Sequence, residues 1–239
     1  MRTALHTQMF RQLAAPLLVC AVALLCSCAS KSEKEASALY KAAQLQFERG
    51  EYDQVINNVT KALELTHDGK STFTISFSFY NGQIHMLRAK AYEALGKMNE
   101  AISDYQTATT RGTEFLSSHG LNSDPKPGAK ANWFRTLSGF FNSLGIAYAK
   151  TGSYAEAIGA FETAIGAAGG SVSRVGVTDQ LVGTIFGGEG GKRQEFANAV
   201  GAYCYNLGLM QEKLGRSNSE AMARARELGY DKTLVIGSK

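Results

Sequence analysis

The sequence is poor in proline and cysteine, and its charges nearly cancel. The 239 residues include three prolines and four cysteines, and 25 Lys plus Arg stand against 21 Asp plus Glu, for a net charge of +4. This near balance argues against a polyanion-binding surface, so nucleic acid is not an expected partner. The apolar content of 44 % and the 25 glycines are those of a folded globular chain.

The N-terminal segment has the anatomy of an export signal. A basic start precedes an almost wholly apolar run from Leu13 to Leu25, which is shorter than the roughly 20 residues that a membrane-spanning helix needs. The run ends in Leu25-Cys26-Ser27-Cys28, which resembles the lipobox of bacterial lipoproteins. The resemblance implies a signal peptide at 1–27, acylation (palmitate) on Cys28 and a short lipid-anchored linker at 28–35. The alternative is an ordinary secretory signal followed by an incidental cysteine.

Few cysteines remain after such processing. Cys20 and Cys26 leave with the signal and Cys28 carries lipid, so Cys204 is the last one in the folded part. An intrachain disulfide is therefore excluded, and an ordinary packed core must hold the domain at 36–239. Cys204 itself lies in an apolar stretch and is expected to be a buried core thiol.

A pattern of turn glycine, polar residues and a small or branched apolar residue recurs along the chain. Its copies begin at Gly50, Gly96, Gly152 and Gly215 and reach Val55, Ala101, Ala157 and Ala221. Residues with helical periodicity lie on both sides of each glycine, so each copy predicts a helix hairpin. The hairpins resemble the tetratricopeptide repeat family. This resemblance predicts an all-α solenoid of about four repeats, in which small residues allow close helix packing: Ala43, Ala89, Gly145 and Gly208 on the first helices, and Ala62, Ala108 and Ala164 on the second.

The turn glycines are 46, 56 and 63 residues apart, whereas the family period is about 34. The excess predicts three long inserts between repeats, at 66–81, 111–132 and 169–193. In the first insert Phe73, Ile75, Phe77 and Phe79 alternate with polar residues, which fits either a strand or a lengthened first helix. The Pro- and Gly-containing segment from Gly120 to Gly128 predicts a loop in the second.

Motifs for catalysis or cofactor binding are not apparent. The glycines before Lys192 lack the Ser or Thr that a phosphate-binding loop places after its lysine. The histidines His67, His85 and His119 are isolated, and no Gly-x-Ser-x-Gly elbow occurs. We therefore expect no enzyme activity, no cofactor and no metal site.

In the resembled family, defined positions of each first helix line a concave groove that binds an extended peptide or protein segment. Carried over to this sequence, the partner-binding positions are Tyr40, Gln44, Phe47, Met86, Lys90, Glu93, Asn142, Ile146, Lys150, Tyr205, Leu209 and Glu212.

Together, the signal and the repeats predict a lipoprotein scaffold that binds an envelope protein at the periplasmic face of a bacterial membrane. Ala29 after the acylated cysteine favours the outer membrane. The alternative is a ligand-binding accessory lipoprotein of a periplasmic transport system, in which the inserts close a pocket over a small apolar ligand.

Overall fold

The computed structural model describes residues 32–66, 75–117, 129–168 and 190–230. The signal peptide at 1–27, Cys28, and the segments 67–74, 118–128 and 169–189 of the three expected inserts lie outside the described residues.

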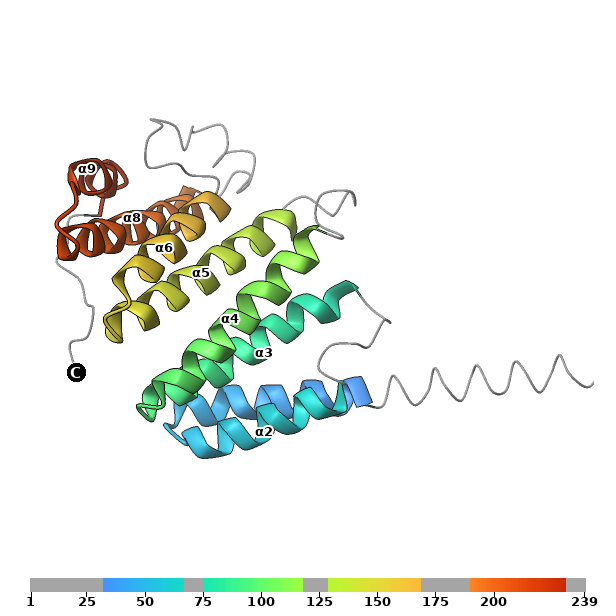
Figure 1. Cartoon of the computed structure of the whole chain (residues 1–239). Coiled ribbons are helices and arrows are strands. Elements are labelled where there is room, and N and C mark those ends of the chain that lie inside the picture. Colours follow the sequence, from blue (N-terminus) through green and yellow to red (C-terminus); the bar gives the residue numbers. More distant parts are fainter. Residues whose placement is uncertain (1–31, 67–74, 118–128, 169–189, 231–239) are drawn as a thin grey trace, which may run out of the picture.

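Helices account for the regular structure of the described part, and they follow one another as antiparallel pairs (Figure 1). The first pair consists of a helix over 32–48 and α2 (Tyr52–Leu65). The later pairs are α3 (Ile75–Ala94) with α4 (Met98–Phe115), α5 (Ala129–Lys150) with α6 (Tyr154–Ala167), and α8 (Gly190–Lys213) with α9 (Ser219–Glu227). Each pair packs against the next one along the chain, which confirms the predicted all-α solenoid of four hairpins.

The turn inside each hairpin depends on its glycine. Gly50, Gly96, Gly152 and Gly215 have φ of 76°, 74°, 80° and 66°, a left-handed conformation that costs glycine little. In the first turn the amide of Gly50 donates to Phe47 O at 3.0 Å, and that of Glu51 donates to Gln46 O at 2.9 Å. This is the Schellman pattern, which satisfies the last carbonyls of a helix, and it recurs in all four turns.

The expected inserts are partly helical. Because α3 begins at Ile75, the alternating segment from there onward is a lengthened first helix, not a strand. Likewise, α4 extends to Phe115 and α5 begins at Ala129, so both ends of the 111–132 insert are helical. The loop predicted at 120–128 lies outside the described residues. The start of α8 at Gly190 places residues 190–193 in a helix as well. At the N-terminal side, the helix from residue 32 includes the last residues of the expected linker.

Small residues make the close helix contacts that the repeat pattern predicted. A Cβ atom placed on Gly145 would lie 2.7 Å from the ring of Phe161, and one on Gly208 would lie 2.9 Å from Met222. The corresponding alanines of the other hairpins, Ala43 and Ala89, are fully buried. A larger side chain at these positions would separate the two helices of its hairpin.

The core divides into neighbouring clusters along the solenoid. One cluster joins the first hairpin to α3 around Val59 and Ile84, a second joins α3 and α4 to α5 around Tyr105 and Phe115, and the third joins the last two hairpins around Phe161. Stability therefore comes from contacts between adjacent repeats, as expected for a solenoid.

Candidate protein-interaction surface

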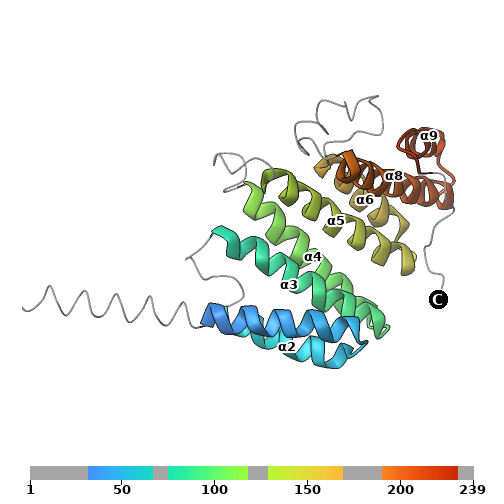
Figure 2. The same ribbon diagram turned by 180° about the vertical axis from the view of Figure 1, so that it is seen from behind.

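The predicted partner-binding residues all lie on the first helices of the four hairpins, which are the helix over 32–48, α3, α5 and α8. We call the surface that these four helices form the first-helix face. Figure 2 views the molecule from behind and brings the helix over 32–48, α3 and α5 to the front. The structure thus brings the predicted residues to one side of the solenoid.

Their exposure differs from helix to helix. Gln44, Lys90, Lys150 and Glu212 are exposed, whereas Tyr40, Phe47, Glu93, Asn142, Ile146, Tyr205 and Leu209 are half-buried. Met86 is only 8 % exposed and belongs to the core around Tyr105. Its position on α3 turns it inward, so Met86 offers a partner little surface.

Two of the charged residues bind each other. Lys150 Nζ on α5 lies 2.6 Å from Glu93 Oε1 on α3, and the hydroxyl of Tyr105 on α4 donates to Glu93 Oε2 at 2.5 Å. Burial, with the neighbouring carboxylate, raises the pKa of the Tyr105 hydroxyl well above its usual range. Glu93 and Lys150 therefore connect the second and third repeats. Lys90 is exposed on the same part of the face, and none of the described contacts gives it such a structural role.

Other polar and aromatic contacts continue along the face. Asn206 Nδ2 on α8 lies 3.4 Å from Asn142 Oδ1 on α5. Phe47 packs edge-on against Tyr52 of its own hairpin, with ring centroids 5.4 Å apart. The ring of Tyr205 lies 5.8 Å from that of Tyr230, so each of these residues already uses part of its surface within the chain.

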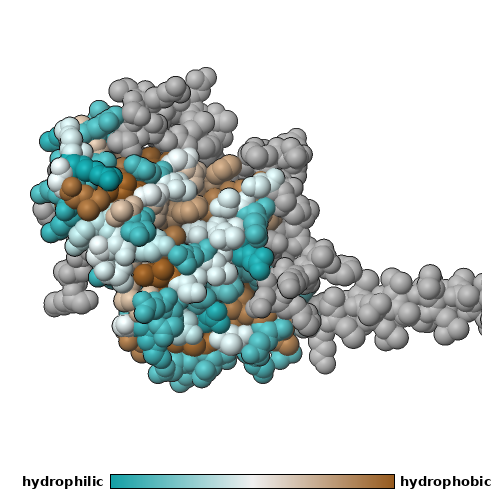
Figure 3. Space-filling view, in the orientation of Figure 1, coloured by the Kyte–Doolittle hydropathy of each residue, from teal (hydrophilic) through white to brown (hydrophobic). Residues whose placement is uncertain are grey.

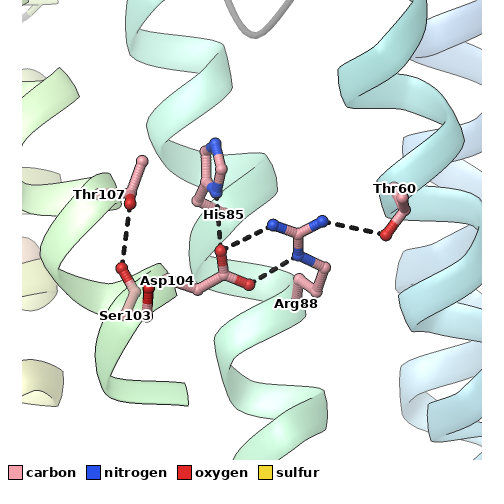
Figure 4. A network of polar contacts seen from close by, with 6 residues as sticks. All are labelled: Thr60, His85, Arg88, Ser103, Asp104 and Thr107. Carbon is pink, nitrogen blue, oxygen red and sulfur yellow. Dashed lines mark hydrogen bonds and ion pairs between the residues drawn. The ribbon is translucent and has the colours of Figure 1, made fainter. Parts of the chain in front are cut away.

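A buried polar network, which the sequence reasoning missed, holds the first repeat to the second (Figure 4). Arg88 Nε and Nη2 on α3 donate to the two carboxylate oxygens of Asp104 on α4 at 2.6 and 2.8 Å. His85 Nδ1 lies 2.9 Å from Asp104 Oδ1, and Arg88 Nη1 donates to Thr60 Oγ1 on α2 at 2.9 Å. In the sequence His85 is an isolated histidine, because its partner lies 19 residues away.

The ionisation of Asp104 reflects competing effects. Burial by itself raises the pKa of this carboxyl group, but hydrogen bonds from Arg88 and His85, together with the guanidinium charge, outweigh burial and hold the pKa below its ordinary value. Asp104 is therefore ionised, and its contacts with Arg88 and His85 hold α4 against α3, from which Lys90 projects. The bond from Arg88 to Thr60 extends the network to α2.

A shallow depression of about 380 Å³ lies between the C-terminal part of α4 and α5, lined by Thr109, Thr110, Thr113, Glu114, Ser117 and Phe141. Thr109 and Thr113 donate their hydroxyls to backbone carbonyls of α4. Because these two hydroxyls are already used as donors, few polar groups of the lining could recognise a ligand. The face drawn in Figure 3 shows small hydrophobic patches between hydrophilic residues.

The described residues contain no group of His, Cys, Asp and Glu that could hold a metal ion. Among the same residues, no helix combines the length and the apolar character that crossing a membrane requires. Cys204 is fully buried, as predicted, and burial raises the pKa of its thiol to about 11.

A comparison with protein families identifies one of the helix hairpins as a known repeat. Residues 82–111, which cover most of the α3–α4 hairpin, match the tetratricopeptide repeat family model. A search of curated proteins finds no match.

Solved structures with low sequence identity are similar to this chain. A TPR-like protein from Chlorobium tepidum TLS is 18 % identical, with 79 % of this chain and 99 % of that chain covered and a TM-score of 0.48. BtubC from P. vanneervenii is 18 % identical, with 88 % and 94 % covered and a TM-score of 0.39. The TPR2AB domain of yeast Sti1, in a complex with pHSP90, is 15 % identical, with 84 % and 99 % covered and a TM-score of 0.25.

The four stacked hairpins with their left-handed turn glycines define an α-helical repeat solenoid. With the family match on the second hairpin, the fold is a tetratricopeptide-repeat solenoid. Proteins of this class are generally interaction scaffolds rather than enzymes.

Proposed function

We propose that this protein is a lipid-anchored scaffold of the bacterial cell envelope, which binds a segment of another envelope protein on its first-helix face. The observation that carries the proposal is the alignment of exposed polar residues with half-buried apolar residues along one side of a repeat solenoid. Gln44 and Lys90 offer hydrogen bonds and charge, and Ile146 and Leu209 offer apolar contact. Such a mixture suits an extended protein segment, because interfaces combine apolar anchors with a polar surround.

The scaffold function can be tested with a pair of charge reversals. Lys90→Glu changes the first-helix face, whereas Lys97→Glu changes an exposed lysine in the turn between α3 and α4. Lys150 is unsuitable, because reversing its charge would also break the ion pair with Glu93. The full-length protein is crosslinked in its native membrane and captured, and the co-purified proteins are quantified by mass spectrometry. We expect Lys90→Glu to lower the yield of a partner several-fold and Lys97→Glu to leave it unchanged; equal yields would exclude this part of the face as the binding site.

The anchor rests on the sequence around Cys28. Each buried CH₂ of an acyl chain contributes roughly 0.8 kcal/mol, and stable attachment needs more than one chain, which lipoprotein processing supplies. Cys28→Ser should abolish incorporation of a palmitate analogue and release the protein from membranes. Cys26→Ser should still incorporate the analogue and stay attached to membranes. Lipid on the Cys28→Ser protein would show that the acceptor is another residue.

A further inference from the structure

The chain leaves its last described helix in a defined direction. Gly229 has φ of 78°, and the amide of Tyr230 donates to Ala225 O at 2.9 Å, so α9 ends with the same Schellman pattern as the first helices. This turn directs the chain back onto α8. There, a Cβ atom on Gly201 would lie 2.6 Å from Tyr230 Cβ, so glycine at this position permits the close approach.

The contact places the exit point beside the first-helix face. The ring centroid of Tyr230 lies 5.8 Å from that of Tyr205, which is one of the predicted partner-binding residues of α8. In each earlier hairpin, the second helix is followed by a first helix that packs against it: α2 by α3, α4 by α5, and α6 by α8. Within the described residues no helix follows α9, and the chain continues from Tyr230 into residues 231–239.

We propose that residues 231–239 of the same chain bind along α8, from Tyr205 past Leu209 towards Glu212, and so cover the fourth repeat's part of the first-helix face. The required length is available. Tyr205 and Glu212 are seven residues apart on a helix, or about 10 Å at 1.5 Å per residue, and nine residues span up to about 30 Å when extended.

The composition of the segment matches that surface. Leu234, Val235 and Ile236 form an apolar run that can pack on the half-buried side chain of Leu209. Lys232 and Lys239 flank this run and complement the exposed carboxylate of Glu212. Because the segment is covalently attached to its site, its effective concentration there is on the order of millimolar, and a weak contact is sufficient.

This inference deepens the proposed function, because a partner would have to displace the segment to reach the fourth repeat. The test below uses no partner, so the two proposals can fail separately. It places a photo-crosslinking amino acid, benzoylphenylalanine, at position 212 of the full chain; the control carries it at position 44, on the helix over 32–48 at the other end of the face. Both positions are exposed, so the replacements leave the core intact.

After irradiation, monomers and covalent dimers are separated, digested and analysed by mass spectrometry. We expect crosslinks from position 212 to residues 231–239 within the monomer, and none from position 44. Val235→Asp should abolish the crosslink and Ser238→Asp should retain it. The proposal is overturned if position 212 gives no crosslink to 231–239, if position 44 gives as many, or if Val235→Asp has no effect. It is also overturned if the crosslinks occur only in covalent dimers, because a second copy then supplies the segment.

Discussion

Removing the Asp104 carboxylate should destabilise the first half of the solenoid. Asp104→Ala removes the acceptor that the guanidinium of Arg88 and the ring of His85 share, whereas the bond from Arg88 to Thr60 is retained. The side chains of Asp104 and Arg88 are 7 % and 17 % exposed, so water replaces the lost bonds poorly. Breaking a buried pair by removing one partner costs about 3–5 kcal/mol, and the limited exposure of Arg88 lowers our expectation to about 2–4 kcal/mol.

Urea unfolding, followed by far-UV circular dichroism, measures this loss. The matched control is Asp53→Ala, which removes an exposed aspartate in the first turn of α2 and should cost about 0.5 kcal/mol through the helix dipole. A combined change to apolar residues, Asp104→Leu with Arg88→Met, should recover most of the loss, because a buried ion pair is often replaceable by apolar packing. An Asp104→Ala loss below about 1 kcal/mol, or one no larger than that of the control, would refute the structural role of the network.

The same network predicts a dependence on pH. Because Arg88 and His85 hold the folded-state pKa of Asp104 below its unfolded value, the carboxylate contributes stability that is present above about pH 4 and is lost as the pH falls towards the folded-state pKa. The difference in unfolding free energy between the wild type and Asp104→Asn should therefore shrink below about pH 4. A difference that stays constant down to pH 2 would contradict the lowered pKa.

Further predictions concern three core positions, Gly145, Asn81 and Cys204, and the exposed Gly159 as a control. Gly145→Ala should lower the free energy of unfolding by about 1–3 kcal/mol, because its Cβ would meet the buried ring of Phe161. Gly159 faces open space on α6, so Gly159→Ala should raise the free energy of unfolding by about 0.5–1 kcal/mol. Urea midpoints that move in the same direction for the two variants would contradict this contrast. Asn81 is fully buried, and neither polar atom of its amide has a hydrogen-bond partner among the described residues. Asn81→Leu should therefore be neutral or stabilising; a loss of more than about 1 kcal/mol in the same assay would show that the amide does bind something. The buried thiol of Cys204 should react with a maleimide at pH 8 only after unfolding; rapid labelling of the folded protein would show that α8 opens.

The repeat pattern made the fold predictable because a left-handed turn and a close helix contact each demand a small residue. Gly50 and Gly145 illustrate the two cases: the first has φ of 76° and the second lies against Phe161. The start of α3 was less predictable, since Ile75 opens a run that alternates between apolar and polar residues, and this pattern fits a strand as well as a buried helix.

The candidate surface was predictable only in part. Family positions identify which helix a residue occupies, and Lys90 is exposed on the helix that they indicate. They do not reveal how far a neighbouring helix covers that residue, which is why Met86 turned out to be buried. The network around Asp104 and the contact of Tyr230 with Tyr205 join residues that are 16 to 28 positions apart, and no local pattern signals such pairs.

Site-specific crosslinking in the native envelope tests the central claim most directly. Benzoylphenylalanine is placed at position 90, on the first-helix face, or at position 57, which is exposed on α2 and outside that face. If the first-helix face binds an envelope protein, position 90 gives a dominant covalent adduct with one protein and position 57 does not. An adduct with the same protein from position 57 alone, or no adduct from position 90, would contradict the account.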